Sequence, residues 1–304
     1  MIDVSICVCT FRRPGGLLRL LRSLGRLDAA SPRCEIIVVD NDADMSAAPA
    51  VEQARAEGLR LAYLVEPLRG IARARNRAVA PARGEFVAFI DDDEEAEPLW
   101  LVHLYGEVLR HGVDGGIGPV LPRFEAPPPP WLIAGDFFAR PRPPTGTSLV
   151  VRGMRTGNAL VRRGRLMALG GPFDERYALT GGEDTELFGR LVDSGCRVIA
   201  VDTAIVHEYL PPNRTTVRYV LRRRFLAGIG SARAHSARDP GPRHRWERLR
   251  WLSSGLAWGI SGLLVFPAAR TRGVTRLALA ARDLGRFAFH SGFSYQPYGR
   301  DSWR

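Results

Sequence analysis

Residues 85–95 read Glu-Phe-Val-Ala-Phe-Ile-Asp-Asp-Asp-Glu-Glu, an apolar run that leads directly into five consecutive acids. The first part, Glu85–Ile90, predicts a buried β-strand. The acids follow at its carboxyl end, where like charges repel one another unless a cation or solvent relieves the repulsion. Two interpretations are open: a hard divalent cation held by Asp91 and Asp93, or a solvated acidic turn before the next helix.

Short apolar runs and helical patterns alternate on both sides of this stretch. The expected strands there are Val4–Thr10, Glu35–Val39 and Leu59–Val65. The expected helices are Leu17–Leu27, Pro49–Glu57, Ile71–Ala80 and Pro98–His111, the last with proline in its first turn. This alternation predicts an α/β fold, a mostly parallel sheet with helices on both faces.

Ligands of parallel sheets bind beyond the carboxyl ends of the strands. Three polar segments follow predicted strand ends, namely Thr10–Arg13, Asp40–Asp42 and Asp91–Asp93. We therefore expect the fold to gather them at one edge of the sheet.

The second half of the chain is less regular. Nine prolines in Pro119–Pro144 predict a long loop without regular structure. Beyond it we expect three strands, a helix at Thr185–Ser194 and helices from Val217 onward; the strands are Thr156–Val161, Arg197–Val201 and Ala204–His207. The chain is predicted to divide into a first domain (1–210, in two halves of about 1–118 and about 119–210) and a helical, Arg-rich extension (211–304).

Charge is distributed unevenly along the 304 residues. The 43 basic residues are all arginine and the formal net charge is +11. Residues 1–209 carry −3, whereas residues 210–304 carry +14. Such asymmetry predicts a tail that meets an anionic surface, either nucleic acid or lipid headgroups.

Leu252–Ala269 contains no charged residue and is flanked by arginines. Three interpretations are open: an interfacial or re-entrant helix pair, a membrane-spanning helix, or a helix packed on the protein body. The clustered arginines favour contact with anionic lipid. The four cysteines form no disulfide framework and the N-terminus lacks a basic signal region, so we expect a reducing cytoplasmic setting at the inner face of the membrane.

Three further motifs are candidates for chemistry. Gly181-Gly182-Glu183-Asp184 precedes a predicted helix and is either a helix cap or a loop that carries a general base. Gly70–Arg77 opens a helix with three arginines, of which one could hold a diphosphate; the alternative is a solvated basic helix. His207 follows a strand and is either structural or a third metal ligand.

Together these motifs resemble glycosyltransferase family 2, the inverting nucleotide-sugar transferases of GT-A fold. The resemblance runs from Val4 to about Gly230 and depends on five elements in order. They are Cys9-Thr10-Phe11-Arg12-Arg13-Pro14, the strand into Asp40, Ala74-Arg75-Asn76, Asp91-x-Asp93 and Gly182-Glu183-Asp184. Gly118–Pro122, Arg155–Asn158 and Leu179–Asp184 also look like the succinoglycan-type exopolysaccharide glucosyltransferases.

The resemblance implies roles for single residues. The residues that would bind the donor nucleotide are Thr10, Phe11 (stacked on uracil), Arg13, Asp40 (on the nucleoside), Arg75 (on the diphosphate), Asp91 and Asp92. The ligands of Mn²⁺ or Mg²⁺ would be Asp93 and Asp91, with His207 as a further candidate. Asp184 matches the catalytic base and Glu183 an acceptor-binding acid, while Gly181, Gly182 and Arg214 are candidates for acceptor or phosphate contacts. Two features depart from the commoner family pattern: Cys9, and Asp40-Asn41-Asp42 in place of Asp-Asp-Gly, a segment that bears on base recognition.

The resemblance implies an inverting hexosyltransferase that moves sugar from a nucleotide-sugar donor, with UDP-hexose favoured. The acceptor would be a lipid-linked oligosaccharide or polysaccharide at a membrane surface, in exopolysaccharide or cell-envelope synthesis, with no nucleic acid as partner. Two alternatives stay open from the residues alone: a basic nucleic-acid-binding protein, and a nucleotidyl- or phosphotransferase on a similar sheet.

Overall fold

The computed structural model describes residues 2–151, 154–238 and 244–293. It divides into two compact units. The first contains Met1–Pro122 and Arg140–Tyr209, and the second contains Arg123–Ala139 and Leu210–Tyr295, apart from the residues just excluded.

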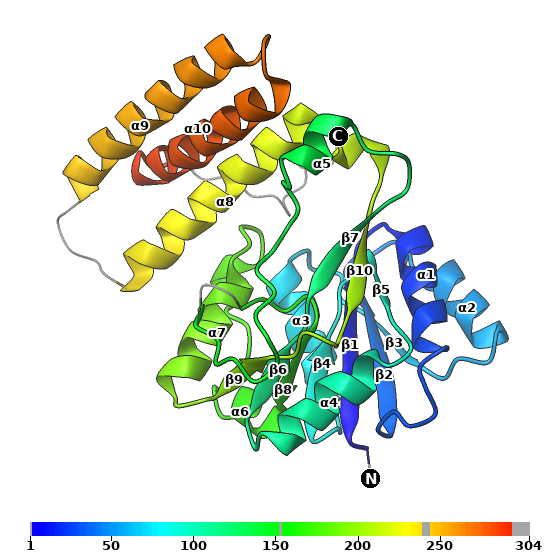
Figure 1. Cartoon of the computed structure of the whole chain (residues 1–304). Helices are drawn as coiled ribbons and strands as arrows, with labels where there is room; N and C mark the ends of the chain where they lie inside the picture. The colour runs from blue at the N-terminus through cyan, green and yellow to red at the C-terminus, as the bar shows by residue number, and fades with distance from the viewer. Residues whose placement is uncertain (1, 152–153, 239–243, 294–304) are drawn as a thin grey trace. The chain divides into compact units, whose positions relative to one another are not determined.

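The first unit is built on a seven-stranded sheet (Figure 1). Its strand order is β3-β2-β1-β4-β8-β6-β9. The strands are β1 (Val4–Thr10), β2 (Cys34–Asp40), β3 (Ala62–Val65), β4 (Phe86–Phe89), β6 (Gly115–Ile117), β8 (Ala159–Arg162) and β9 (Val198–Ala200). β1 pairs in parallel with β2 and β4, while β8 is antiparallel to both neighbours, β4 and β6. The predicted mostly parallel α/β sheet is therefore confirmed.

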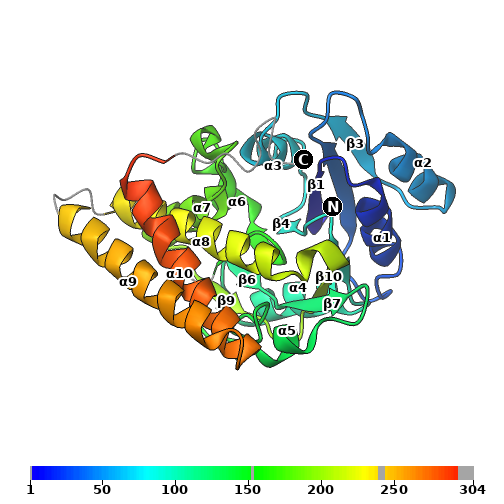
Figure 2. The same cartoon turned by 90° about the horizontal axis from the view of Figure 1, so that it is seen from above.

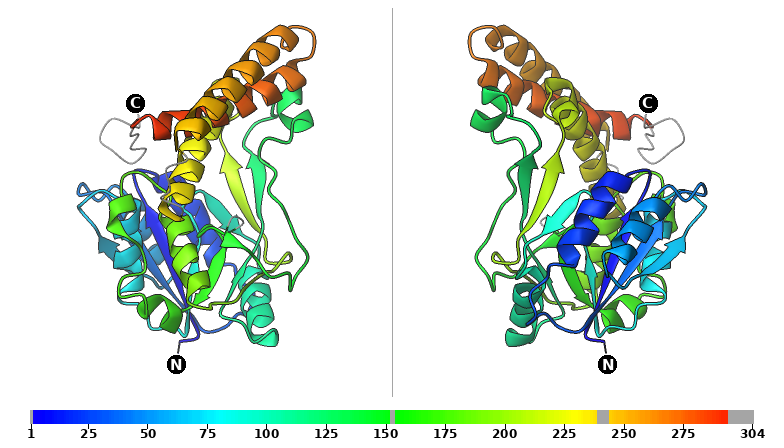
Figure 3. Two further views of the ribbon diagram at one scale, coloured as in Figure 1. Left: turned by 90° about the vertical axis from the view of Figure 1, so that its left-hand side faces the viewer. Right: turned by 90° about the vertical axis from the view of Figure 1, so that its right-hand side faces the viewer.

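Helices cover both faces of this sheet, as the side views show (Figure 3). One face packs on α1 (Pro14–Leu24), α2 (Ala48–Ala56) and α4 (Trp100–Arg110), and the other on α3 (Ile71–Val79), α6 (Arg163–Met167) and α7 (Glu183–Asp193). Alternate residues of β1 serve the two cores, because successive strand side chains point to opposite faces. Val4, Ile6 and Val8 belong to the first core and Cys7 to the second.

A second, three-stranded sheet has the order β5-β10-β7. Its strands are β5 (Glu94–Ala96), β10 (Val206–Leu210) and β7 (Val120–Phe124). β5 was not foreseen, because the sequence there continues the acidic run. Backbone pairing explains it: β10 runs antiparallel to β5 and places His207 opposite Glu95.

The prediction that Pro119–Pro144 lacks regular structure was wrong. The segment contains β7 and a short helix, α5 (Pro130–Ala134). A proline can begin a helix because its fixed φ suits the first turn and its missing N–H leaves no intrahelical bond unmade. The same rule predicted that the next helix begins at Pro98, but α4 begins two residues later, at Trp100.

The second unit is mainly helical, with α8 (Val217–Arg238), α9 (His244–Val265) and α10 (Arg270–His290). The three helices lie side by side, with α10 packed on both of the others (Figures 1 and 2). Trp131, Phe138, Val220 and Val274 belong to its apolar core. No helix among the described residues is both long enough and apolar enough to cross a membrane.

Candidate functional site

A cavity of about 370 Å³ lies at the carboxyl ends of β1 and β4. Most of the residues singled out in the sequence line it, although they come from distant parts of the first unit. They are Thr10, Phe11, Arg13, Arg75, Asp91, Asp92, Asp93, Gly181, Gly182, Glu183 and Asp184. The expected gathering of the strand ends thus occurs for all three polar segments, the second of which reaches the cavity through Asn41.

Arg13 holds the acidic run in place. Its Nη1 lies 3.0 Å from Oδ1 of Asp92 and 3.0 Å from Oδ2 of Asp93. Thr10 donates a hydrogen bond of 2.8 Å to the second oxygen of Asp92. Burial raises the pKa of Asp92 to about 6, although the Arg13 charge opposes the rise. Asp92 is therefore a buried support of the loop, whereas Asp91 and Asp93 flank it on the cavity wall.

Arg75 bridges two acids from different elements. One terminal nitrogen bonds to Glu183 at the start of α7, and the other lies 3.2 Å from Oδ1 of Asp91. Arg75 and Glu183 are both buried. Burial raises the pKa of Glu183 to about 7, against the opposing effect of Arg75. The bridge ties the acidic loop to the segment that carries Asp184.

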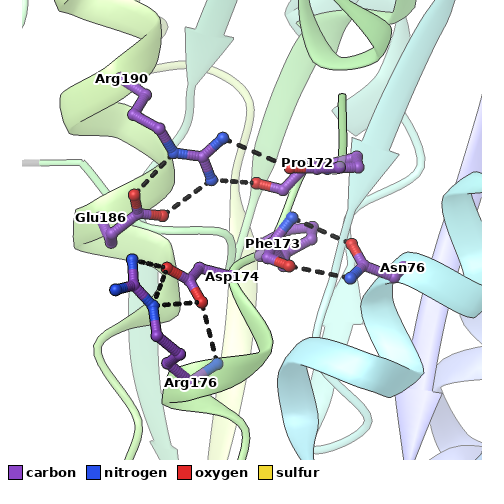
Figure 4. Close-up of polar contacts among 8 residues, drawn as sticks. Asn76, Pro172, Phe173, Asp174, Arg176, Glu186 and Arg190 are labelled. Carbon is purple, nitrogen blue, oxygen red and sulfur yellow. Dashed lines mark hydrogen bonds and ion pairs between the residues drawn. The ribbon is translucent and has the colours of Figure 1, made fainter. Parts of the chain in front are cut away.

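The neighbouring Asn76 fixes the chain that leads into α7 (Figure 4). Its amide nitrogen donates to the carbonyl of Phe173 at 2.8 Å, and its oxygen accepts from the N–H of Phe173 at 2.9 Å. On the other side of this segment, Arg190 of α7 donates to the carbonyl of Pro172 at 2.7 Å and pairs with Glu186. The loop before the Gly-Gly-Glu-Asp segment is thus bonded to both α3 and α7.

Asp184 occupies the first turn of α7. Gly181 and Gly182 precede it with φ of 70° and 93°, a backbone conformation that glycine adopts readily. Oδ1 of Asp184 accepts a hydrogen bond of 2.6 Å from the N–H of Thr185. Asp184 makes no ion pair with any residue that the structure describes, because the nearby Arg75 is engaged by Glu183 and Asp91.

Phe11 presents a ring at the cavity and has a cationic neighbour that the sequence analysis missed. The Arg69 guanidinium lies 4.4 Å from the centre of the ring, within the range of a cation–π contact. Arg69 directly precedes Gly70, the first residue of the arginine-rich motif Gly70–Arg77. Its position beside that motif is the sequence feature that could have identified Arg69 as a site residue.

Asp40, expected to bind a nucleoside, does not line the cavity. It is fully buried, and its Oδ2 accepts hydrogen bonds from the N–H of Ala47 at 2.8 Å and from the hydroxyl of Tyr63 at 2.9 Å. The next residue, Asn41, reaches the cavity instead and accepts from the N–H of Gly70 at 2.7 Å. Successive residues at a strand end point in opposite directions, which explains why Asn41 and not Asp40 faces the cavity.

His207 and Arg214 also lie outside the cavity lining. Nε2 of His207 is 2.9 Å from Oε1 of Glu97, while the adjacent Glu208 faces the cavity. Alternation along β10 explains this exchange. Arg214 belongs to the second compact unit, in the short 3₁₀ helix Pro212–Arg214.

Several other residues line the cavity without a role predicted from the sequence. They are Arg140, Arg155, Thr156, Gly157 and Glu208, of which Arg155, Thr156 and Gly157 belong to the Arg155–Asn158 motif. Arg140 lies within the proline-rich segment, where no periodicity indicates which side chains turn inward. Arg140 bonds Glu208 at 3.0 Å.

The carboxylates of the cavity fit a divalent cation that the substrate helps to hold. No group of three His, Cys, Asp or Glu side chains forms a ready metal site in the described part of the chain. Asp91 and Asp93 supply the hard oxygen ligands that Mg²⁺ and Mn²⁺ take when substrate phosphates complete the shell. Gly157 keeps space open beside Asp91, because a Cβ there would lie only 3.0 Å from its Oδ2.

Comparisons with solved structures agree with this fold. TarS of S. aureus in complex with UDP-GlcNAc superposes with a TM-score of 0.58 at 17% identity, covering 97% of this chain and 93% of that one. A mannosyltransferase from Pyrobaculum calidifontis in complex with GDP-Man and Mn²⁺ gives 0.63 at 20% identity, over 93% and 86% of the two chains. These identities support the fold alone.

Sequence comparisons identify the family. The glycosyl transferase family 2 model matches residues 5–165. The succinoglycan biosynthesis protein ExoM of Rhizobium meliloti (strain 1021) is 34% identical over 283 residues, covering 92% of this chain and 90% of that protein. The expected resemblance is confirmed, and the chain belongs to glycosyl transferase family 2.

Proposed function

We propose that this glycosyltransferase inverts the anomeric centre of its donor and that Asp184 is the catalytic base. One observation carries the proposal: Asp184 shares the cavity with Asp91 and Asp93 but, among described residues, makes no ion pair. An unpaired carboxylate can accept a proton, whereas the adjacent Glu183 is occupied by Arg75. Glu183 accordingly acts as a positioning residue.

The reaction follows from this arrangement. Asp184 takes the proton from an acceptor hydroxyl, and the oxygen attacks the anomeric carbon of the donor from the side opposite the diphosphate. The new carbon–oxygen bond forms as the bond to the phosphate oxygen breaks, and the nucleoside diphosphate leaves with the electron pair. Because attack is in line, an α-linked donor gives a β-linked product.

The leaving diphosphate is the place where negative charge develops. A Mg²⁺ or Mn²⁺ ion held by Asp93 and Asp91 would supply Lewis-acid stabilisation of that charge. Arg13 keeps Asp92 and Asp93 in place, and Thr10 supports Asp92 from the strand end. These residues form the donor side of the proposed site.

Phe11 is proposed to stack on the base of the donor nucleotide, with Arg69 behind its ring. UDP-hexose is the favoured donor, because TarS was crystallised with UDP-GlcNAc and ExoM takes part in succinoglycan biosynthesis. The mannosyltransferase bound GDP-Man, so GDP-sugars are the alternative to test. Succinoglycan biosynthesis also favours a lipid-linked oligosaccharide or polysaccharide as the acceptor.

Contact with a membrane surface is proposed for α9. One face of this helix packs on α10, where a Cβ at Gly255 or Gly262 would lie within 3.0 Å of a leucine side chain. The other face exposes large apolar side chains at helical spacing, namely Trp246, Leu249, Leu256, Ile260, Leu263 and Leu264. Exposed arginines lie beside the first residues of this stripe and beyond its end: Arg248 and Arg250, then Arg270 and Arg272.

Such a helix suits the plane of an anionic bilayer surface. The apolar stripe enters the boundary between headgroups and acyl chains, and each flanking arginine adds about 1 kcal/mol of attraction to acidic lipid. We place the protein at the cytoplasmic face of the inner membrane, where a lipid-linked acceptor is available.

A donor screen tests the proposal. Release of nucleoside diphosphate is measured with each common UDP- and GDP-sugar, with Mg²⁺ or Mn²⁺ and with membrane extract as the acceptor source. We expect release with UDP-hexoses, a β-linked product by NMR, and loss of transfer in Asp184→Asn with donor binding retained. Transfer by Asp184→Asn within a few-fold of wild type would overturn the role of Asp184.

A further inference from the structure

The arginines of the catalytic cavity are not equivalent. Arg13 pairs with Asp92 and Asp93, Arg75 with Asp91 and Glu183, and Arg140 with Glu208. Arg155 lines the same cavity but forms no ion pair or hydrogen bond with any residue in the described ranges. Its Nε is buried and unsatisfied.

An unpaired arginine in this position is unfavourable in the free protein. Burial and the charge of Arg140 together lower the pKa of Arg155 to about 10, although Glu94, Asp184 and Glu208 oppose the shift. A partly buried cation without a hydrogen-bonded counter-ion destabilises the fold. The cavity therefore contains a guanidinium whose donors are free for a ligand.

Arg155 and Arg140 also line a second, smaller cavity of about 40 Å³. Its wall includes Pro119, Leu121 and Arg142. The two arginines thus stand where the two cavities adjoin. An anion held between them lies within the electrostatic reach of Asp184, the proposed base.

We propose that Arg155 and Arg140 bind an oxyanion, a phosphate or carboxylate, carried by the acceptor. A planar guanidinium offers paired donors that match such a group. This inference rests on the proposed function, because it takes Asp184 to mark the acceptor side. The donor diphosphate is already assigned to other residues of the cavity, Asp91, Asp93 and their arginine supports.

The alternative source of the oxyanion is the donor diphosphate itself. The two sources differ in one respect that can be measured. An acceptor oxyanion binds beside a bound nucleotide, whereas an oxyanion of the donor occupies the same place as the diphosphate of UDP. Inorganic phosphate is therefore a suitable probe, with and without saturating UDP.

Isothermal titration calorimetry of the full chain tests the proposal. Phosphate is titrated into wild type, Arg155→Gln and Arg110→Gln, each alone and each saturated with UDP and Mg²⁺. Arg110 is an exposed arginine paired with Glu107 and serves as the matched control. We expect phosphate to bind wild type and the control equally with or without UDP, and at least about tenfold more weakly to Arg155→Gln. UDP affinity should stay within twofold in all three.

Two results would overturn the inference. Competition between UDP and phosphate in wild type would assign the oxyanion to the donor, and unchanged phosphate affinity in Arg155→Gln would remove Arg155 from the site. A lack of UDP binding would instead contradict the proposed donor. The role of Arg155 would then be decided by the phosphate affinities of wild type and Arg155→Gln without UDP. Thermal unfolding supplies a further check, since Arg155→Gln should raise the Tm if the guanidinium is unpaired in the free protein, and a fall in Tm would show that it is satisfied.

Discussion

Arg75 and Glu183 form a buried ion pair that joins the middle of α3 to the first residue of α7. They are 108 positions apart in the chain. Their contact fixes the first residue of α7 and with it the position of Asp184, the next residue. Arg75 also reaches Asp91, so the metal-side acid and the base-side helix share one support. The family resemblance predicted that Arg75 binds the donor diphosphate. Its ion pairs with Glu183 and Asp91 favour a role in positioning these two acids instead.

Removing the arginine of this pair should be strongly destabilising. Arg75→Met leaves Glu183 without its counter-charge in a buried site, and breaking a buried pair from one side costs about 3–5 kcal/mol. We expect that loss in the free energy of unfolding measured with urea. The double variant Arg75→Met/Glu183→Leu should recover most of it, because no buried charge is left without a partner at that position. A loss below about 1 kcal/mol in the single variant would contradict a buried pair.

The polar groups of the sheet edge could be predicted where strand and acid follow each other directly. The strand Val4–Thr10 and the acids after β4 were found because an apolar run and its abrupt end are both visible in the sequence. Which member of an adjacent pair faces the cavity could not be found this way. Asn41 lines the cavity where Asp40 was expected, and Glu208 lines it where His207 was expected. The reason is that successive side chains of a strand point to opposite sides.

The sequence did not predict which residues of the irregular segments reach the cavity, although Arg155 belongs to the Arg155–Asn158 motif. Arg140 and Arg155 flank long stretches whose backbone path is set by tertiary contacts, such as the turn at Asn158. Asn158 is fully buried with a positive φ of 64°, and its side chain bonds the carbonyls of Pro119 and Ala204 and the indole of Trp100. No local pattern encodes such a junction.

Asn76 should control the placement of the loop before α7. Asn76→Ala removes both hydrogen bonds to Phe173 and leaves two backbone groups unpaired. We expect a loss of about 1–3 kcal/mol in the free energy of unfolding, together with a lower kcat and nearly unchanged affinity for UDP. Gln53→Ala, an exposed change on α2, is the control and should alter none of the three. A fall in UDP affinity as large as the fall in kcat would show that Asn76 acts on the donor instead.

Gly157 should be intolerant of a side chain for a reason that can be separated from folding. A Cβ there would lie 2.9 Å from Oε1 of Glu94 and 3.0 Å from Oδ2 of Asp91, so these carboxylates must shift by some tenths of an ångström. We expect Gly157→Ala to weaken Mg²⁺-dependent UDP binding about tenfold, or about 1.4 kcal/mol. Gly164→Ala is the matched control, since nothing lies within 4 Å of its Cβ and alanine favours its helix. Equal UDP affinity in the two variants would separate Gly157 from the metal site.

Asp93 should make nucleotide binding depend on the metal. Asp93→Ala removes a proposed oxygen ligand, so UDP should bind this variant equally with Mg²⁺ and with EDTA, at the weaker affinity that wild type shows in EDTA. Arg13, which pairs with both Asp92 and Asp93, keeps a partner in the variant and should hold the loop in place. The comparison is made by calorimetry at equal ionic strength. A response to EDTA equal to that of wild type would exclude Asp93 as a ligand.

The exposed face of α9 should decide binding to anionic vesicles. Ile260 and Leu263 are 61% and 65% exposed, and full burial of such side chains is worth about 1.5–3 kcal/mol each. Ile260→Ser/Leu263→Ser should therefore lower the fraction that sediments with vesicles rich in phosphatidylglycerol by at least about tenfold. Leu109→Ser, at an exposed leucine of the first unit, controls for the loss of a surface apolar group. Binding to neutral vesicles should be weaker for wild type and should not respond to salt, because the arginines then have no acidic headgroups to attract. If the double variant and the Leu109 control sediment alike, α9 does not carry the membrane contact.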